Sequence, residues 1–327
     1  MTVPKSALWG RKATLVVSTG TIGLDLSELR FTFKTSNSDA QTPNTLYVRI
    51  YNLSPHTVAK IGTYGRAEFS TITLQAGYGN SYGIIFSGTI KQTAKGRERN
   101  VDNYLDVWAA DGDSFYNFSA ISVSLAAGHT PQQVVNAIVN TPSINGTPPV
   151  KFAQDVDGLI VGVGPGLKRS LSRGKAIFGL PRDYLRDWAD KYGYRWSIQN
   201  GEFVVVPITG YRPGEAVVLS PDTGLVGVPE ACDGGVRARA LLNPKIRIGC
   251  LVRIAQGDIN HITQQQFGLT APNTLPSATL ATVAGMYRVM TAEFTGDTRG
   301  NEWYVDLICL AVDASAPDQS QSVAVAA

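Results

Sequence analysis

The sequence predicts a mainly β protein with an α+β middle, in which two antiparallel β-barrel-like domains flank a mixed domain. Three observations support this prediction. Apolar and polar residues alternate along short runs in the first and last thirds, a pattern typical of half-buried strands. Turn residues separate these runs, and the chain contains 33 glycines. The stronger helix signals are confined to the middle third.

The composition favours a subunit of a larger assembly. Only 17% of the 327 residues are charged, against about 25% in ordinary soluble domains, and charge is depleted at the core of protein interfaces. The net charge of +3 is too small to indicate a dedicated nucleic-acid binder, so we expect no nucleic-acid specificity. We also expect no secretory signal and no membrane insertion, because no uncharged run approaches the ~20 apolar residues of a membrane span.

The first third reads as five strands and one short helix. Ser54 is a good helix N-cap, and Pro55 follows at the first helical position, where its missing N–H has no cost. A short helix over 54–61 is therefore expected between the strands. The strands are expected at 29–33, 46–51, 69–74, 83–90 and 104–109.

The middle third carries two helices and a hairpin. Thr130-Pro131-Gln132-Gln133 forms a capping box that opens an apolar run over 134–139, and the Pro/Gly-rich segment 141–149 ends it. A second helix begins at Pro181 and ends at Gly193, where a left-handed residue is wanted. Asn200-Gly201 between runs 194–198 and 202–206 is a strong hairpin signal.

The last third returns to strands, at 235–242, 246–255, 285–294 and 303–310. The Gln/Thr/Pro-rich segment 257–282 is long for a connection and is expected to be functional or ordered by a partner. The end, 314–327, is expected to be a flexible tail in isolation. The predicted domains are 1–113 (N-terminal β-barrel-like), 114–207 (middle α+β), 208–313 (C-terminal β-barrel-like) and the tail 314–327.

One short stretch recurs near the two ends of the chain. Tyr104-Leu105-Asp106-Val107 resembles Tyr304-Val305-Asp306-Leu307, each follows a charged polar turn, and each ends near an aspartate, Asp111 or Asp313. Two identities in four residues occur easily by chance. Together with the β–(α+β)–β order, the recurrence leaves two related β-domains and two unrelated ones as open alternatives.

Signals for catalysis or cofactor binding are missing from the sequence. His56, His129 and His261 have no metal-ligand spacing, and the three cysteines, Cys232, Cys250 and Cys309, form no CxxC pair. The glycine-rich run 162–166 lacks the third glycine and the following helix of a dinucleotide fingerprint and reads as a flexible loop. We therefore expect no cofactor, no metal and no enzymatic activity.

The charged groups read as structural. Asp111/Asp113 and Asp155/Asp157 are too close in sequence to face one another across a cleft. The charges of the helix after Pro181 fit a solvated face. Basic residues gather in two sets, which fit acidic partner surfaces as well as they fit nucleic acid: Lys91, Lys95, Arg97 and Arg99, then Arg237, Arg239, Lys245, Arg247 and Arg253.

Several stretches over roughly 13–313 resemble the baseplate hub protein of contractile-tailed bacteriophages. The most specific are C-terminal, at 224–229, 241–249 and 296–304, and others lie at 51–55, 76–78, 85–88 and 110–113. Their chemistry is that of turns and caps rather than catalysis. The residues that carry the resemblance are Pro55, Gly77, Gly88, Asp111, Gly112, Asp113, Gly227, Pro229, Asn243, Pro244, Gly249, Gly296, Asp297, Gly300 and Trp303.

The resemblance implies a homotrimer with two barrel-like domains per subunit, hence a ring of pseudo-six-fold symmetry. Such a ring joins a six-fold tail tube protein to a three-fold central spike protein, with the tape-measure and other baseplate proteins as further partners. It implies a location in the virion, at the tail baseplate, after assembly in the host cytoplasm, and it transfers no catalytic residue. Two alternatives stay open: another tail component, tube-like or a distal-tail adaptor, and a cell-wall-degrading tail enzyme.

Overall fold

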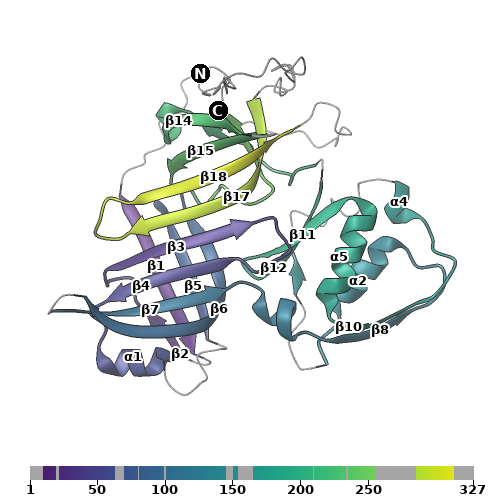
Figure 1. Ribbon diagram of the computed structural model, residues 1–327, viewed down its shortest axis with the longest axis horizontal. Helices are drawn as coiled ribbons and strands as arrows, with labels where there is room; N and C mark the ends of the chain where they lie inside the picture. Colours follow the sequence, from purple (N-terminus) through teal and green to yellow (C-terminus); the bar gives the residue numbers. More distant parts are fainter. Residues whose placement is uncertain are drawn as a thin grey trace, which may run out of the picture.

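A large antiparallel sheet and a smaller α+β body make up the computed structural model of the chain (Figure 1). The mainly β class with an α+β middle, predicted from alternation, is confirmed. The structure describes residues 10–19, 22–62, 70–79, 81–98, 101–144, 150–153, 165–208, 210–232, 235–254 and 285–312. The expected loop 257–282 and tail 314–327 lie outside the described residues.

The N-terminal part of the sheet contains seven strands. Side chains alternate between buried and exposed along β3 and β4, as the sequence pattern predicts. The elements are β1 (Arg11–Thr19), β2 (Ile22–Asp25), β3 (Phe31–Ser38), β4 (Thr45–Tyr51), α1 (Pro55–Gly62), β5 (Thr71–Tyr78), β6 (Ser81–Glu98) and β7 (Asp102–Ala110).

The C-terminal part adds six strands to the same sheet. They are β13 (Val217–Leu219), β14 (Leu225–Cys232), β15 (Gly235–Leu241), β16 (Leu251–Ile254), β17 (Met286–Asp297) and β18 (Trp303–Ala311), with a short 3-10 helix, η3 (Pro221–Thr223), before β14. The strand order is β14-β15-β18-β17-β3-β4-β7-β6-β5-β1-β2, and β16 pairs with both β17 and β13. One hydrophobic cluster lies under both parts of this 13-stranded sheet.

The α+β body lies beside the sheet and has its own core. Its aromatic centre stacks Tyr116 on Trp196 and Trp196 on Phe203, within a cluster drawn from residues 115–205. Its elements are η2 (Ser114–Phe118), β8 (Ile121–Leu125), α2 (Pro131–Asn140), β9 (Lys151–Phe152), α4 (Pro165–Lys168), β10 (Lys175–Gly179), α5 (Pro181–Tyr192), β11 (Tyr194–Gln199) and β12 (Glu202–Pro207).

The local signals in this body form the structures that the sequence predicts. Thr130 accepts a hydrogen bond from the Gln133 N–H while the Gln133 side chain accepts one from the Thr130 N–H, which completes the capping box. Gly193 ends α5 with φ 74°. Asn200 and Gly201 both have positive φ, as the tight turn between β11 and β12 requires.

The predicted strand 246–255 is correct only in its second half. Residues 246–250 form turns, with Gly249 at φ 82°, and β16 begins at Leu251. The glycine supplies a backbone conformation that a continuous strand cannot contain. A second difference is the single turn of helix α4, which begins at Pro165 within the glycine-rich run 162–166.

Strands β1, β2, β8, β9, β10, β13 and β14 were not expected from the sequence. β14 contains Gly227 and Pro229, which read as turn residues. Proline is tolerated on an edge strand or at a bulge, and β14 is the end strand of the sheet with a register shift between Val226 and Glu230.

Candidate functional site

The recurring Tyr-x-Asp stretch contacts an arginine of a neighbouring strand at both of its positions. Arg49 on β4 lies opposite Asp106 on β7 and donates to both carboxylate oxygens, at 2.8 and 3.0 Å. Its guanidinium also lies 4.0 Å from the centre of the Tyr104 ring. The hydrogen bonds to Asp106 raise the pKa of Arg49.

The second copy of this arrangement lies on β15 and β18. Arg239 is opposite Asp306 and donates to both carboxylate oxygens, at 2.6 and 3.0 Å. Its guanidinium is 5.8 Å from the centre of the Tyr304 ring. The sequence stretch therefore supplies two residues of a three-residue unit, and the arginine comes from the neighbouring strand.

Strand order extends the equivalence from three residues to five strands. The order β3-β4-β7-β6-β5 in the N-terminal part matches β14-β15-β18-β17-β16 in the C-terminal part. Within each set of five strands, the strand that comes last in the sequence lies between the second and the fourth, so β7 lies between β4 and β6, and β18 between β15 and β17. We call these sets repeat 1 (β3 to β7) and repeat 2 (β14 to β18). They differ in that α1 is inserted only in repeat 1.

A β-bulge falls at the same place in both repeats. Counting from the paired aspartates, the bulge in repeat 1 is at Lys91, between the pairs Ile90–Ala109 and Gln92–Trp108. In repeat 2 it is at Met290, between Val289–Cys309 and Thr291–Ile308. Bulges are specific local features rather than random defects, so a shared bulge supports a common design of the two repeats.

The two repeats are joined edge to edge by β3 and β17. β17 pairs with β18 on one side, and its other side pairs first with β16 and then with β3. The β3–β17 pairs are Ser38–Thr291, Asn37–Ala292, Lys34–Thr295, Phe33–Gly296 and Thr32–Asp297.

Side chains reinforce this joint at the hairpin between β17 and β18. Arg30 forms an ion pair with Asp297 at 2.9 Å, and Phe33 packs edge-on against Trp303 with ring centres 5.5 Å apart. Burial opposes ionisation of Asp297, but hydrogen bonds from Arg30 and the Arg299 N–H outweigh it and lower the pKa of Asp297. A Cβ at Gly296 would lie 2.4 Å from the Phe33 ring, so the close approach of ring and backbone needs glycine.

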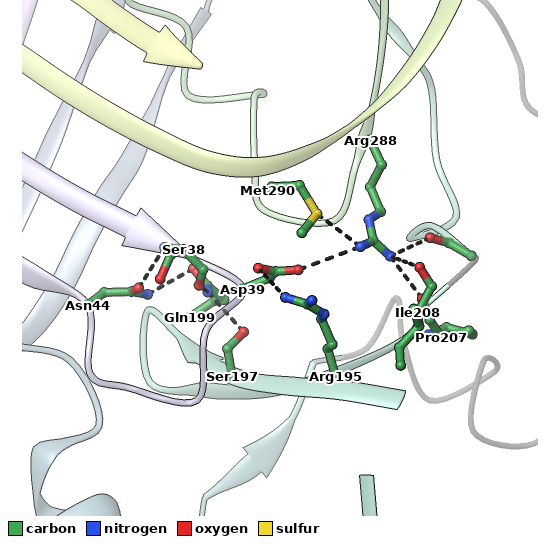
Figure 2. Close-up of polar contacts among 11 residues, drawn as sticks. Ser38, Asp39, Asn44, Arg195, Ser197, Gln199, Pro207, Ile208, Arg288 and Met290 are labelled. Carbon is green, nitrogen blue, oxygen red and sulfur yellow. Dashed lines mark hydrogen bonds and ion pairs between the residues drawn. The ribbon is translucent and has the colours of Figure 1, made fainter. Parts of the chain in front are cut away.

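A buried arginine binds the segment that leaves the α+β body. Figure 2 shows Arg288, from β17, donating to the carbonyl oxygens of Pro207 and Ile208 at 2.9 and 3.0 Å, and it also donates to Gly210 at 2.9 Å. Asp39 lies 3.6 Å from Arg288. Burial lowers the pKa of Arg288. Its Nη1 donates to the three carbonyls, and its Nη2 donates to the Met290 sulfur at 2.9 Å and faces the Asp39 carboxylate.

Asp39 also contacts the α+β body directly. Arg195 of β11 donates to its carboxylate at 3.3 Å (Figure 2). Burial raises the pKa of Asp39, while the charge of Arg195 opposes that rise. Next to this pair, Asn44 donates to the Ile198 carbonyl and the Gln199 side chain, both at 3.0 Å, so the turn between β3 and β4 is fixed to the end of β11.

The tip of the β11–β12 hairpin is held by a buried carboxylate. Asp111 is 1% exposed and accepts hydrogen bonds from the N–H groups of Asn200 and Gly201. Burial raises the pKa of Asp111 to about 7, and these two hydrogen bonds oppose the rise. The Asn200 side chain in turn accepts from the Ser87 N–H at 3.1 Å. The hairpin is thus anchored on β6 and on the segment that enters the body.

The neighbouring motif residues support the same anchor. Gly112 has φ 70°, and a Cβ there would lie 2.7 Å from Ile198. Asp113 accepts from Lys91 and from Asn117, the latter at 2.7 Å. The turn that enters the α+β body is therefore fixed by both of its aspartates.

The other motif residues shape turns and close contacts. Pro55 begins α1, and Asn243 accepts from the Ser81 hydroxyl at 2.9 Å. The remaining glycines and prolines lie at close backbone approaches, at the bulge of β14 or beside these turns: Gly77 against Ser81, Gly88 against Ala110, Gly300 against Asp297, Pro244 beside Gly83, Gly249 beside Arg212, and Gly227 and Pro229 in β14.

The histidines and cysteines, for which the sequence predicts no catalytic or metal-binding role, lie in the following surroundings. His129 is buried with Nδ1 2.7 Å from the Ala126 carbonyl, and His56 is exposed on α1. Burial raises the pKa of the Cys309 thiol to about 12. Across the described ranges, no three His, Cys, Asp or Glu side chains gather as metal ligands, and no helix is long and apolar enough to span a membrane. His261, Asp155 and Asp157 lie outside the described residues.

The basic residues do not form one continuous patch. Arg237 and Arg239 share the exposed face of β15, as alternation predicts. Lys95 and Arg97 instead line an open groove of about 790 Å³ between α1 and the β6–β7 hairpin. The rest of the lining is mixed, with apolar side chains such as Leu53, Val58 and Leu105 beside polar ones such as Thr93 and Asn103.

Solved structures with this fold come from phage tails and type VI secretion systems. No protein-family model and no curated protein matches the sequence. The Escherichia coli c3393 protein, described as a type VI secretion component similar to T4 bacteriophage tail proteins gp27 and gp5, superposes with TM-score 0.53 at 9% identity, over 91% of this chain and 77% of that chain. A 43 kDa tail protein of prophage MuSo2 from Shewanella oneidensis gives 0.54 at 10% identity, over 92% and 98%. A chain of the Francisella PdpA–VgrG complex gives 0.51 at 7% identity, over 95% and 60%.

Proposed function

We propose that this chain, which has the fold of phage tail and type VI secretion spike proteins, is the baseplate hub of a contractile phage tail. In this function it forms a homotrimer that binds the six-fold tail tube protein on one side and the three-fold central spike protein on the other. The tape-measure and other baseplate proteins are further candidate partners. Its place is the baseplate of the virion, after assembly in the host cytoplasm, and its role is structural rather than enzymatic.

One observation carries the proposal: a single chain holds two β repeats with the same strand order, joined edge to edge. Three such chains supply six equivalent repeats, which can match a six-fold partner. The same three chains supply only three α+β bodies, one per chain, which match a three-fold partner. A protein with both features can connect two symmetries that do not otherwise fit.

The second repeat distinguishes the hub from the alternative of a tube-like or distal-tail component. Such a component needs one repeat per chain, since its own ring already has six copies. The matched units Arg49–Asp106 and Arg239–Asp306 support two repeats in this chain. The site geometry also favours binding over catalysis, because the charged side chains of Asp111, Asp113 and Arg288 are all occupied in fixing segments of the chain to one another.

The proposal is tested by measuring the mass of the assembled protein and its binding to tubes. The purified chain of 35.0 kDa is analysed by mass photometry, alone and mixed with its tail tube and spike proteins, and then sedimented with preformed tubes. We expect trimers that bind tube ends. A chain that stays monomeric in every mixture, or that assembles as six copies, contradicts the hub function.

A further inference from the structure

One half of strand β6 has an open edge. β6 pairs with β5 over 81–89 and, on its other side, with β7 over 89–98. Beyond Thr89, the side that faces β5 therefore has no pairing partner among the described strands. Unpaired backbone groups on such an edge are a template for another strand.

Repeat 2 shows what occupies the equivalent edge. Asp106 pairs with Ala94 in repeat 1, and Asp306 pairs with Glu293 in repeat 2, so β6 from Lys91 onward corresponds to β17 from Met290 onward. In β17 this edge is filled by β3, the first strand of repeat 1. The open edge of β6 is thus the position at which a first strand is expected.

The first strand of repeat 2 has an open edge as well. β14 is the end strand of the sheet and pairs only with β15 among the described strands. Thr32 is opposite Arg49, and Val226 is opposite Arg239, so β14 corresponds to β3 with Val226 in the place of Thr32. Since the bulge adds two residues, Glu230 takes the place of Lys34 and Cys232 that of Ser36.

We infer that β14 of a second copy of this chain adds to the open edge of β6 and repeats between subunits the β3–β17 joint found within one chain. The inference rests on the proposed ring for the number of copies, and it adds which strands meet and in which register. Carried over from the internal joint, the register sets Val226 opposite Glu98, Glu230 opposite Gly96, and Cys232 opposite Ala94.

The groove beside β6 fits this occupant. In the internal joint, Phe33 contacts Gly296 and Trp303. In repeat 1, Arg97 takes the place of Gly296 and Asn103 that of Trp303, and both line the groove. The β14 bulge, 227–229, stands at the position of Phe33 and carries Val228, which is 65% exposed in the single chain. The added strand would bring this apolar side chain toward the apolar part of the groove lining, formed by Leu53, Val58 and Leu105, where it is removed from water.

The charges at the inferred joint differ from those of the internal joint at one pair of positions. Lys34 of β3 forms an ion pair with Glu293 of β17 at 3.2 Å. Between subunits the corresponding diagonal neighbours are Glu230 and Ala94, so the new joint has one acidic side chain diagonally across from a neutral one. This difference provides a charge test, because substitutions at these two positions can recreate the internal pair with its charges intact.

Disulfide trapping tests the register. Directly opposite residues in an antiparallel pair have Cβ atoms about 4.5–5.5 Å apart, close to the separation that a disulfide needs. Cys232 is exposed in the single chain, so Ala94→Cys alone creates a candidate pair. We expect the full-length assembled variant to shift to covalent dimers and trimers on non-reducing gels. Thr93→Cys, one residue away on the opposite face of β6, is the matched control, and Ala94→Cys with Cys232→Ser must remove the cross-link.

A charge exchange provides a second test that does not depend on oxidation. Ala94→Glu places two acids at the joint and is expected to weaken assembly at least tenfold, whereas Ala94→Glu with Glu230→Lys restores it. If the wild-type chain forms a trimer, the Ala94→Cys variant forms no cross-link and the charge exchange does not change assembly, the inferred joint is wrong. The proposed hub function is not contradicted by that result. A chain that never assembles with its tail partners overturns both.

Discussion

Asp111 accepts a hydrogen bond from the Gly201 N–H at 2.9 Å, although the two residues are 90 positions apart. The contact ties the segment that enters the α+β body to the tip of the hairpin by which the chain returns. Asp111 is buried, and the described residues place no basic side chain in hydrogen-bond contact with it.

Asp111 is expected to make stability depend on pH. Its pKa is about 7 in the folded chain and about 3.9 in an unfolded one. The folded state therefore binds the proton more tightly, and the contribution of Asp111 to the free energy of unfolding decreases as pH rises from about 4 to 7. Urea unfolding at pH 5 and pH 8 should show a larger loss for the wild type than for Asp111→Asn. Equal losses in the two proteins contradict the assigned burial.

Arg288 is expected to stabilise the contact between β17 and the end of the α+β body. Arg288→Met removes the donors to three carbonyls and one of the two arginines that contact Asp39. This should lower the free energy of unfolding by roughly 3–5 kcal/mol, the usual cost of breaking a buried charged pair. Arg288→Lys should recover little, because one ammonium cannot reproduce the planar fork. Thermal and urea unfolding measure both variants, and a lysine variant as stable as the wild type would refute the assigned geometry.

The two equivalent arginines should differ in their effect on stability. Arg49→Ala leaves the buried carboxylate of Asp106 with the Tyr47 hydroxyl but without its charged partner, whereas Asp306 is partly exposed and solvated. We expect Arg49→Ala to cost about 2 kcal/mol or more and Arg239→Ala no more than about 1 kcal/mol, as for surface pairs. Chemical denaturation of the two variants compares them directly, and equal costs would count against this difference in burial.

Gly296 should tolerate no side chain. A Cβ at this position meets the Phe33 ring at 2.4 Å, so Gly296→Ala should cost about 1–3 kcal/mol through overpacking. Gly23→Ala in β2 is the matched control, because nothing lies within 4 Å of a Cβ there. Adding Phe33→Leu to the alanine variant should recover part of the loss. Differential scanning calorimetry tests all three, and a Gly296→Ala variant as stable as Gly23→Ala would contradict the joint.

Local sequence signals predicted the local structure of this chain well. The capping box at Thr130, the left-handed Gly193 and the Asn200-Gly201 turn each depend on a few neighbouring residues, and each is confirmed. Alternation also located β3, β4, β7, β15 and β18. Edge strands such as β14 were missed, since their glycine and proline carry turn signals and only the sheet shows that an edge tolerates them.

The long-range contacts could be predicted only in part. The Tyr-x-Asp recurrence marked β7 and β18, yet nothing in the sequence paired Asp106 with Arg49 or Asp306 with Arg239, because the arginines come from other strands. Arg288 and Asp39 carried no signal at all, since a lone arginine in a strand is usually solvated. Pairing across 249 residues depends on the packed fold rather than on local pattern.

The central claim is that two equivalent repeats per chain form a ring of six. Cryo-electron microscopy of the chain assembled with its tail tube tests it most directly, through projections along the tube axis. The account predicts three subunits whose strands form a continuous ring of six similar repeats, with three α+β bodies outside the ring. Six subunits around the axis, or three subunits whose repeats 1 and 2 lie at different radii, would contradict it.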